Sequence, residues 1–401
     1  MGFIRSDLNN WTPWIVSNVM DCLLLLLDDR PRLCEGLARA LRMLDRYLAC
    51  VSPDGGCDEG CAYWNMAGGA LLDCLESLRL ATGGKADFYA NPLIRAIGEF
   101  PLKVHIAGDW FLNFADCDAK PALDAERVYR YGQRTGNEAL MALGAGLNAR
   151  GGVRPQDTPQ MSRVLNALFN PAPRGCMPPP AGMALDDLQL YAFTENGLYA
   201  AVKGGHNGES HNHNDVGGFV LYADGQPEII DLGNMRYTAK TFGPERYTLP
   251  NTRSENHNVP MPGGVEQAAG RAYAARDVHY TSNGVTMDIA AAYPLGARLL
   301  ALTRGLSLSP KGVVLSDAVS FESPLPVTWV FMLRNRPALR PGRADFGALT
   351  MRFPPSLQAE ATEYPVTDER MRRCFPGSVW RLTLTAAPAA LHNVIFNIQR
   401  S

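Results

Sequence analysis

The chain has 401 residues, a net charge of −2, 46% apolar residues and 19% charged residues. This length exceeds what one compact core usually serves, so we expect at least two domains. The near-neutral charge and the lack of a basic block exclude a general nucleic-acid binder. The apolar run Cys22–Leu27 is far shorter than the roughly 20 residues of a membrane span, and it is typical of the buried face of a helix.

The first part of the chain predicts helices. Thr12 is expected to cap a helix that has Pro13 at its first position and runs to about Leu27, and Asp29 is expected to cap a second helix that starts near Pro31. Leucines from Leu33 to Leu48 follow helical spacing, and the turn-forming residues 52–56 end this helix. Further helices are expected from after residue 60 to about 80, and over 91–100, 124–134, 137–148 and 160–169.

A proline-rich stretch marks the change from helices to strands. Prolines cluster in residues 171–180, and short strand patterns separated by turns follow from Leu188. We therefore expect a helical domain over 1–172, a linker over 173–187 and a β domain over 188–401. Strands are expected at 188–193, 198–202, 218–222, 228–230, 313–315, 327–333, 349–353, 380–385 and 394–398.

Histidine is concentrated in one loop of the expected β domain. The chain has seven histidines, and three of them, His206, His211 and His213, fall within eight residues. A His-x-His pair on extended backbone points both imidazoles to one face, which suits a metal site or one ligand beside a catalytic group. The alternative is a solvated polar loop, which does not account for the concentration of a rare residue.

Two later segments supply partners for His213. Asp231 ends an apolar strand, and a carboxylate in such a place needs a partner. His257 lies in another polar loop, so His213, Asp231 and His257 together offer two nitrogens and one oxygen, a plausible zinc set. Spacing along the chain does not by itself show that the three converge.

The helical part contains a weaker signal. A glycine-rich turn, residues 54–60, leads to Tyr63 and Trp64 at the expected start of a helix. A tyrosine in such a place can move a proton if it faces a cleft, although a Tyr-Trp pair at a helix start more often packs. In isolation, the residues Asn9, Asn10 and Trp11 before the first helix are a still weaker signal.

Taken together, these segments resemble the heparinase II/III-like family. The resemblance is strongest over about 188–262, in particular the run Ser210–Asp215 followed by Gly217–Phe219, and weaker over about 8–82. It implies an α+β multidomain protein: an incomplete (α/α) toroid followed by a large antiparallel β-sandwich, with both parts contributing to one active site. Between about 85 and 185 it rests on helical character only.

The resemblance also implies an activity and roles for single residues. The activity is a polysaccharide lyase that cleaves a uronic-acid-containing glycan by β-elimination, so an acidic polysaccharide is the expected partner. Asn10 matches the residue that neutralises the uronate carboxylate, while Tyr63, His211 and Tyr237 match acid–base positions. The metal ligands of zinc-holding members match His213, Asp231 and His257. Substrate contacts are expected from Asn9, Trp11, Glu59, Trp64, His206 and Arg253.

Two features depart from the family pattern. Several members have a histidine directly after the asparagine, where this chain has Trp11. The helical part is also short, which suggests N-terminal truncation.

The family implies a periplasmic or secreted protein, whereas Met1–Arg5 shows no signal peptide, so a genuine start would imply the cytoplasm. The alternatives are an inactive carbohydrate-binding remnant and a zinc-dependent hydrolase. The polysaccharide and the oligomeric state are not predicted.

Overall fold

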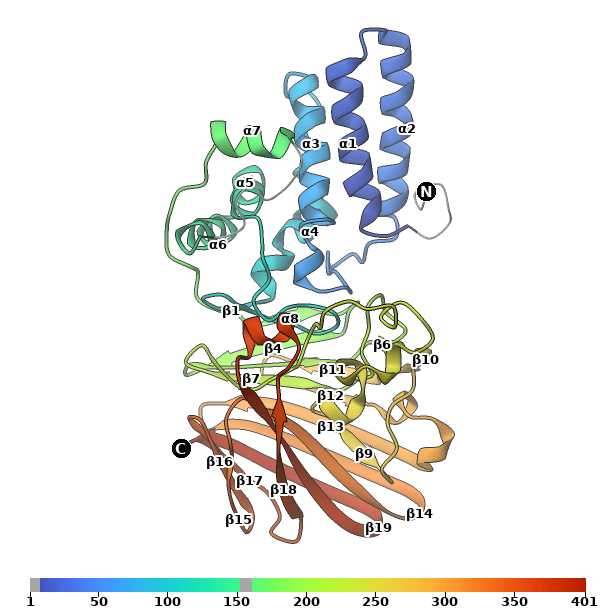
Figure 1. Cartoon of the computed structure of the whole chain (residues 1–401), viewed down its shortest axis with the longest axis vertical. Helices are drawn as coiled ribbons and strands as arrows, with labels where there is room; N and C mark the ends of the chain where they lie inside the picture. The colour runs from blue at the N-terminus through green and yellow to red at the C-terminus, as the bar shows by residue number, and fades with distance from the viewer. Residues whose placement is uncertain (1–7, 152–160) are drawn as a thin grey trace. The chain divides into compact units, whose positions relative to one another are not determined.

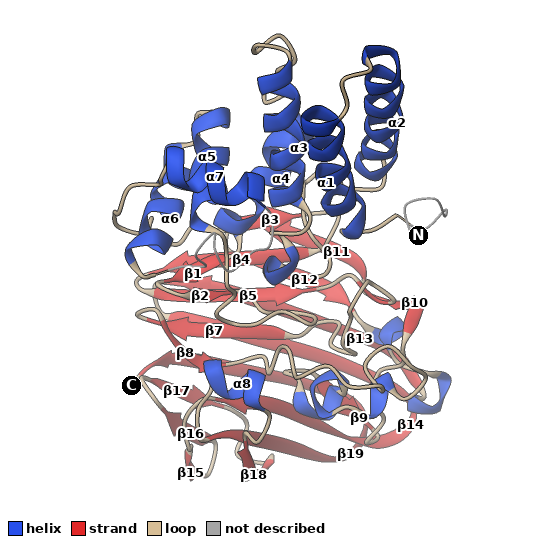
Figure 2. Ribbon diagram, turned by 45° about the horizontal axis from the view of Figure 1, so that its top comes forward, coloured by secondary structure: helices blue, strands red, loops and turns tan. Residues whose placement is uncertain are grey.

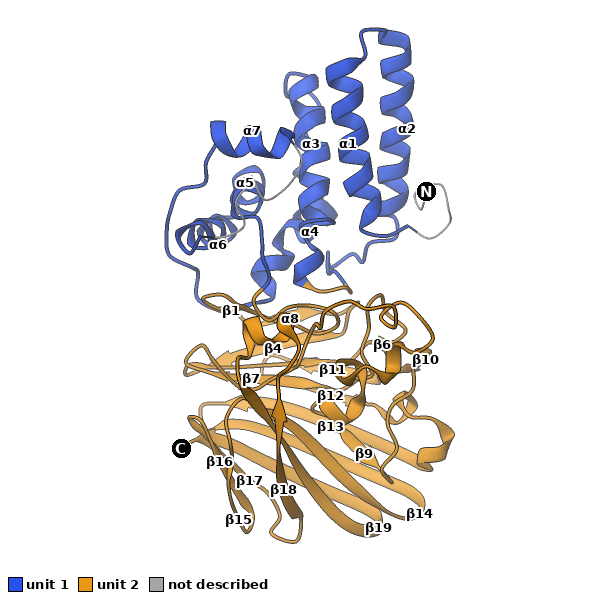
Figure 3. Cartoon of the chain, in the orientation of Figure 1, with its two compact units in different colours: residues 1–57, 61–105, 121–179 blue, residues 58–60, 106–120, 180–401 orange. Residues whose placement is uncertain are grey.

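A computed structural model describes residues 8–151 and 161–401. The chain divides into two compact units (Figure 3). Unit 1 comprises residues 1–57, 61–105 and 121–179, and unit 2 comprises residues 58–60, 106–120 and 180–401. The main boundary between the two units lies between Pro179 and Pro180, inside the stretch predicted as a linker. Two short segments from the predicted helical part therefore fold with the β unit.

Unit 1 is helical, and apart from the third predicted helix its helices follow the predicted ranges closely (Figure 1). Helix α1 packs against both α2 and α3, and α5 packs against α6. No helix within residues 8–151 and 161–401 is long and apolar enough to cross a bilayer. In chain order the helices are α1 (Trp11–Leu26), α2 (Arg30–Leu48), the short 3-10 helix η2 (Cys61–Tyr63), α3 (Gly68–Ala81), α4 (Pro92–Lys103), α5 (Ala125–Thr135), α6 (Glu138–Ala149) and α7 (Met161–Phe169).

The helix starts confirm one predicted cap and correct another. The Asp29 carboxylate accepts the Arg32 backbone N–H at 3.0 Å, so the predicted cap of α2 is confirmed. Thr12 does not cap α1, because it lies buried inside the helix and Asn10 is the N-cap residue. The predicted third helix begins later than expected, at Gly68, after the 3-10 turn that contains Tyr63.

The apolar run at the end of α1 is more exposed than the sequence suggests. Leu25 and Leu26 are 79% and 78% exposed, so the prediction of one buried face is wrong for them. A continuous run of apolar residues surrounds a helix on all sides, whereas contacts with α2 and α3 cover only part of its circumference. The uncovered part forms an open apolar groove that includes Trp11, Cys22 and Leu26.

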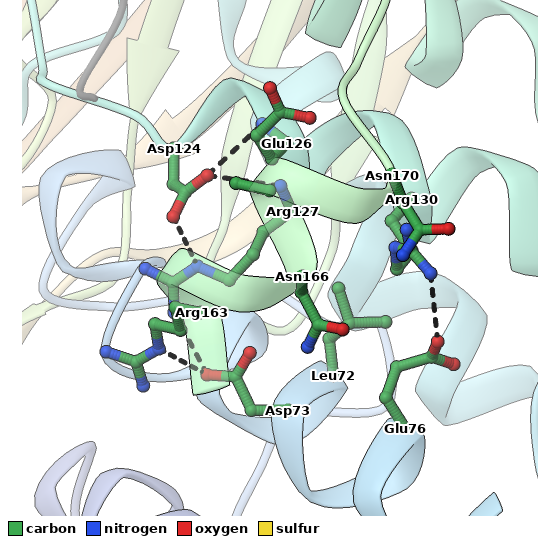
Figure 4. A pocket seen from close by; sticks show the side chains of 11 residues that line it. Leu72, Asp73, Glu76, Asp124, Glu126, Arg127, Arg130, Arg163, Asn166 and Asn170 are labelled. Carbon is green, nitrogen blue, oxygen red and sulfur yellow. Dashed lines mark hydrogen bonds and ion pairs between the residues drawn. The ribbon is translucent and has the colours of Figure 1, made fainter. Parts of the chain in front are cut away.

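Buried ion pairs hold the helices of unit 1 together around a small polar pocket (Figure 4). Asp73 of α3 pairs with Arg163 of α7 at 2.6 Å and with Arg127 of α5 at 3.4 Å. Glu76, one turn further along α3, accepts Arg134 at 2.7 Å and the Tyr89 hydroxyl at 2.7 Å. These contacts join α3, α5 and α7 through ion pairs that are largely shielded from solvent.

Unit 2 is built on one extended antiparallel sheet system of 15 strands (Figure 2). Its main path runs β15-β16-β17-β19-β14-β8-β7-β5-β4-β3, while β9 and β13 also pair with β14, β18 pairs with β19, and β11 and β12 extend from β13. The strands are β3 (Met183–Leu185), β4 (Leu190–Glu195), β5 (Leu198–Lys203), β7 (Phe219–Ala223), β8 (Gln226–Ile229), β9 (Pro260–Pro262), β11 (Arg276–Thr281), β12 (Gly284–Asp288), β13 (Leu299–Ser309), β14 (Gly312–Leu333), β15 (Ala338–Arg340), β16 (Arg343–Phe346), β17 (Leu349–Arg352), β18 (Gln358–Pro365) and β19 (Ser378–Arg400).

Smaller elements complete unit 2. Strand β1 (His105–Ala107), whose first residue still belongs to unit 1, pairs with β2 (Trp110–Phe111), and β6 (His206–Asn207) pairs with β10 (Gly270–Ala274). The short helices are η4 (Arg246–Thr248), η5 (Pro250–Thr252), η6 (Ser254–Asn256), η7 (Ala290–Ala292), η8 (Leu295–Ala297) and α8 (Glu369–Cys374).

The predicted large antiparallel β-sandwich is confirmed. Strands β14 and β19 pair along almost their whole length, with register shifts between Ser320 and Val327. Their inward side chains share one core with those of β5 and β7, as the edge-to-face contacts of Phe331 with Phe219 and Phe396 show. This core fixes the strand ends from which the histidine loop and its partners emerge.

We expect Glu76→Gln to lower the free energy of unfolding of unit 1 by about 2–3 kcal/mol at neutral pH. Burial opposes ionisation of Glu76, but hydrogen bonds from Arg134 and Tyr89 outweigh it, and the pKa of Glu76 is lowered. Its contribution is therefore complete above the pKa of the unfolded chain and is lost as the pH falls through the folded pKa. Urea unfolding followed by helical circular dichroism at neutral and acidic pH measures this difference.

The matched control is Glu35→Gln, because Glu35 forms an exposed ion pair with Arg39 on α2. Equal effects of the two substitutions, or an effect of Glu76→Gln that persists at acidic pH, would contradict the assignment.

Candidate functional site

A buried lysine anchors the histidine loop to the sheet. The loop leaves β5 directly after Lys203, whose Nζ atom lies 2.8 Å from Glu209 Oε2 and 3.5 Å from Asp215 Oδ1. Burial alone lowers a lysine pKa, but the charges of Asp215 and Glu209 dominate and raise the pKa of Lys203. One cation at the start of the loop thus holds the middle and the end of the loop, and two carboxylates keep the lysine charged.

A second buried cation joins the histidine loop to the loop of His257. Arg304 on β13 forms two hydrogen bonds with Asp317, at 2.8 and 2.7 Å. Its remaining nitrogen, Nη1, donates to the Gly217 carbonyl at 2.8 Å and to the Asn258 carbonyl at 2.7 Å. Gly217 ends the first loop and Asn258 follows His257, so two segments far apart in sequence are fixed to one guanidinium.

His211 lies on a turn and not on extended backbone. Its φ is +57°, a left-handed conformation that is uncommon for residues other than glycine, so the extended geometry considered for the His-x-His pair is wrong. Its Nδ1 atom lies 2.9 Å from Asp116 Oδ2 and 3.4 Å from the Tyr237 hydroxyl. The structure therefore brings together two of the predicted acid–base residues, His211 and Tyr237, both within unit 2.

Asp116 was not among the residues that the sequence singled out. Its carboxylate lies between His211 and His213, with Oδ1 3.0 Å from His213 Nε2, and Oδ2 also accepts Arg246 at 3.0 Å. Burial opposes ionisation of Asp116, but hydrogen bonds from His211 and His213 and the charge of Arg246 outweigh it, so its pKa is lowered. Asp116 belongs to the segment 106–120 that folds into unit 2.

The predicted metal ligands converge. His213, Asp231 and His257 are all buried, and one possible ligand atom from each lies within 4.8 Å of the others. His257 Nδ1 lies 2.8 Å from Asp231 Oδ2, and the two imidazole centroids are 5.3 Å apart. Among the residues that the structure describes, no hydrogen-bond partner reaches His213 Nδ1, although that atom is buried.

The surroundings of the triad suit a cation. His213 Nε2 faces Asp116, and His257 Nε2 faces the Asn251 carbonyl at 2.9 Å. Each outer nitrogen thus faces an oxygen, so a neutral ring that keeps its proton on that nitrogen would present its lone pair on Nδ1, the arrangement common for metal-binding histidines. Burial disfavours protonation of His257, but the adjacent Asp231 charge dominates and raises its pKa to about 9. A positive charge is therefore favoured at this position.

The predicted site residues of unit 1 differ in accessibility. Asn10 is buried at the start of α1, and the Asn9 side chain accepts the Trp11 backbone N–H at 3.1 Å. Trp11 is 54% exposed, and Tyr63 is partly exposed in η2. Trp64 is 1% exposed and donates to the Ile97 carbonyl at 2.8 Å, so it packs in the core of unit 1 and offers no surface to a substrate.

The remaining predicted contacts lie in unit 2. Glu59 is buried, and the His206 ring accepts the Gly208 backbone N–H at 3.1 Å. Arg253 lines an open groove of about 490 Å³ together with Asn214, Tyr247, Thr248, Glu266 and Gln267. Its guanidinium pairs with Glu266 and Glu255, so the charge it offers to this groove is already compensated.

Comparison with known proteins finds a family model that matches most of the β unit. Residues 177–365 match the family described as Heparinase II/III-like, C-terminal. No curated protein matches the chain by sequence. Among solved structures, a heparinase III, the BT4657 gene product, is 13% identical with a TM-score of 0.71, over 98% of this chain and 60% of that chain.

Two further structures support the same fold. A structure titled heparinase III is 16% identical with a TM-score of 0.70, over 99% of this chain and 62% of that chain. The heparan sulfate lyase HepC from Pedobacter heparinus is 15% identical with a TM-score of 0.63, over 98% of this chain and 61% of that chain. The chain therefore shares their fold and spans about three fifths of their length.

We expect Lys203→Met to lower the free energy of unfolding of unit 2 by about 3–5 kcal/mol, because it leaves Glu209 and Asp215 as buried carboxylates without a cation. The midpoint of guanidinium unfolding measures the loss. Lys311→Met, at an exposed turn, is the matched control. Similar midpoints for the two variants would refute the anchoring role.

We expect Zn²⁺ to stabilise the metal-stripped protein, by about 2.7 kcal/mol when free zinc is 100 times its dissociation constant. Asp231→Asn and His257→Ala remove ligands and are expected to abolish this gain, whereas His279→Ala, at an exposed position on β11, keeps it. Thermal unfolding with and without zinc measures the effect. If zinc stabilised the His257→Ala variant as much as the wild-type chain, the triad would be excluded as the zinc site.

Proposed function

Because residues 177–365 match the Heparinase II/III-like, C-terminal family model, we propose that this chain is a polysaccharide lyase acting on a uronic-acid-containing glycan. The observation that carries the proposal is the pair His211 and Tyr237, which places an imidazole and a phenol 3.4 Å apart beside a buried carboxylate. Such a pair can accept and donate protons at neighbouring positions. The named activities of the similar structures are in keeping with it.

The proposed reaction is a β-elimination. The C5–H bond of the uronate breaks, its electron pair forms a double bond between C4 and C5, and the glycosidic oxygen leaves C4 and takes up a proton. The C5 proton becomes acidic enough only if the uronate carboxylate is neutralised by hydrogen bonds or positive charge. By the family resemblance we assign this neutralising role to Asn10.

Two residues are proposed to move the protons. The Asp116 carboxylate is an acceptor, so the short contact with His211 Nδ1 requires a proton there and puts the neutral ring's lone pair on Nε2. We propose that His211 takes part in abstracting the C5 proton and that Tyr63 acts as the acid, or as acid and base in turn. Tyr237 is proposed to assist through its contact with His211.

We propose that zinc occupies the triad of His213, Asp231 and His257 and has a structural role. The three residues are 0–3% exposed, which favours a structural role, because a catalytic zinc would have to be reached by its substrate. When bound, zinc would supply a cation that joins the loops of His213, Asp231 and His257. The same burial argues against the alternative of a zinc-dependent hydrolase.

The proposed substrate is an acidic polysaccharide, and a periplasmic or extracellular location follows from the resemblance. Arg253 is offered as one groove contact on unit 2. Its compensated charge favours contacts with sugar hydroxyls more than recognition of a further anionic group. Asn9, Trp11, Glu59 and His206 remain proposed contacts, whereas the buried Trp64 is not carried forward.

We expect the chain to generate an unsaturated uronate from at least one member of a panel of heparan sulfate, hyaluronan, chondroitin sulfate and alginate. Ultraviolet absorbance of the conjugated product measures the rate. Tyr63→Phe and His211→Gln are each expected to lower kcat by about 10²- to 10⁴-fold, because each removes an acid–base group.

Matched controls lie side by side on β11. Tyr280→Phe and His279→Gln make the same chemical changes at exposed positions and are expected to keep full activity. Saturated products would indicate a hydrolase, and glycan binding without any product would indicate an inactive remnant. Full activity of Tyr63→Phe would remove the role assigned to that residue.

A further inference from the structure

We propose that Asp116 is a positioning residue that serves the candidate base and the metal triad at the same time. One carboxylate sets which nitrogen of His211 and which nitrogen of His213 carries the proton. This inference deepens the proposed function and rests on it for the role of His211. The part that concerns His213 and the metal triad stands on the contacts of unit 2 alone.

The geometry divides the two carboxylate oxygens between the two rings. Oδ2 accepts His211 Nδ1 at 2.9 Å and Arg246 Nη2 at 3.0 Å, while Oδ1 accepts His213 Nε2 at 3.0 Å. Asp116 is 1% exposed, so water does not compete effectively for these contacts. Three donors converge on one group that can only accept while it is ionised.

The two rings meet this carboxylate through opposite nitrogens, and the consequences differ. His211 is held with its proton on Nδ1 and its lone pair on Nε2, the form proposed for proton abstraction. His213 is held with its proton on Nε2 and its lone pair on Nδ1, the buried atom of the metal triad. Both tautomers require a group that accepts from both rings. A donor facing either ring would move the proton of that ring to its other nitrogen.

The backbone around Asp116 is held without help from its carboxylate. The Asn234 side chain donates to the Asp116 carbonyl at 2.7 Å. The Phe111 N–H donates to the Ala119 carbonyl at 2.9 Å, and Arg370 forms two hydrogen bonds with Asp118 at 2.8 Å each. The carboxylate is therefore not needed to close this loop, and its contribution lies in its contacts with the two imidazoles and with Arg246.

Arg246 extends the same network to the residue between the two histidines. Besides Asp116, its Nη2 atom donates to the Asn212 carbonyl at 3.1 Å, and Nη1 donates to the Thr241 carbonyl at 3.0 Å. The guanidinium compensates the buried carboxylate and fixes the chain between His211 and His213. Because Oδ2 accepts two donors, an amide at this position would turn its oxygen toward Arg246 and His211.

The decisive variant is therefore Asp116→Asn, which keeps the shape. Its amide nitrogen would face His213 Nε2 and force the proton of that ring onto Nδ1, where it blocks metal binding. We expect the affinity for Zn²⁺, measured by competition with a chelator, to fall by about 10- to 100-fold. The control Asp224→Asn makes the same change at an exposed pair with Arg400, and zinc affinity should not change.

Three further measurements complete the experiment. Nitrogen-15 NMR of histidine side chains in the wild-type chain should show the proton of His211 on Nδ1 and that of His213 on Nε2. Asp116→Asn should move the His213 proton to Nδ1. If the chain is an active lyase, the variant should lower kcat by more than it raises KM, because loss of positioning affects the chemical step.

The outcomes separate this inference from the proposed function. A wild-type His211 with its proton on Nε2, or an Asp116→Asn variant with zinc affinity within about twofold of wild type, would overturn it. If the variant does not fold, the wild-type tautomers decide. If the wild-type chain has no lyase activity but shows the expected tautomers and zinc loss, the proposed function fails while the role of Asp116 toward the triad stands.

Discussion

The candidate site of the β unit depends on one buried carboxylate that accepts three donors. Asp116 contacts His211, His213 and Arg246 within 3.0 Å, and at a position that is 1% exposed water competes little for these contacts. A buried charge of this kind is stable only when it is paired and hydrogen-bonded. The pairing connects the group proposed to move a proton with a group proposed to hold a metal.

Two further buried cations give the site its rigidity. Lys203 fixes the middle and the end of the histidine loop to β5, and Arg304 fixes that loop to the segment after His257. Both cations lie on strands of the sandwich, whose core supplies the framework. Catalytic loops positioned by a rigid sheet are a common arrangement, and here ion pairs provide the attachment that apolar packing cannot give to polar loops.

Elements with strong local signals were predictable from the sequence. Asp29 caps α2 as expected, and the turns at 194–197 and 223–225 join paired strands. Predictions from the sequence pattern were wrong where local preferences compete with the packing of neighbouring elements. Thr12 lies inside α1, α3 begins only at Gly68, and Leu25 and Leu26 are exposed, because which side of a helix is covered depends on its neighbours and not on its composition.

The sequence by itself determined which residues could do chemistry: the unusual concentration of histidine between Lys203 and Asp215, and the Asp231 and His257 that complete a ligand set. Only the tertiary structure decided that these three ligands converge, that Trp64 is a core residue, and that Asp116 stands between two histidines about 95 residues further along the chain. The reason is physical. Residue type and local spacing set what a side chain can donate or accept, whereas its partner is chosen by the folding of segment 106–120 onto the sandwich, which no local pattern encodes.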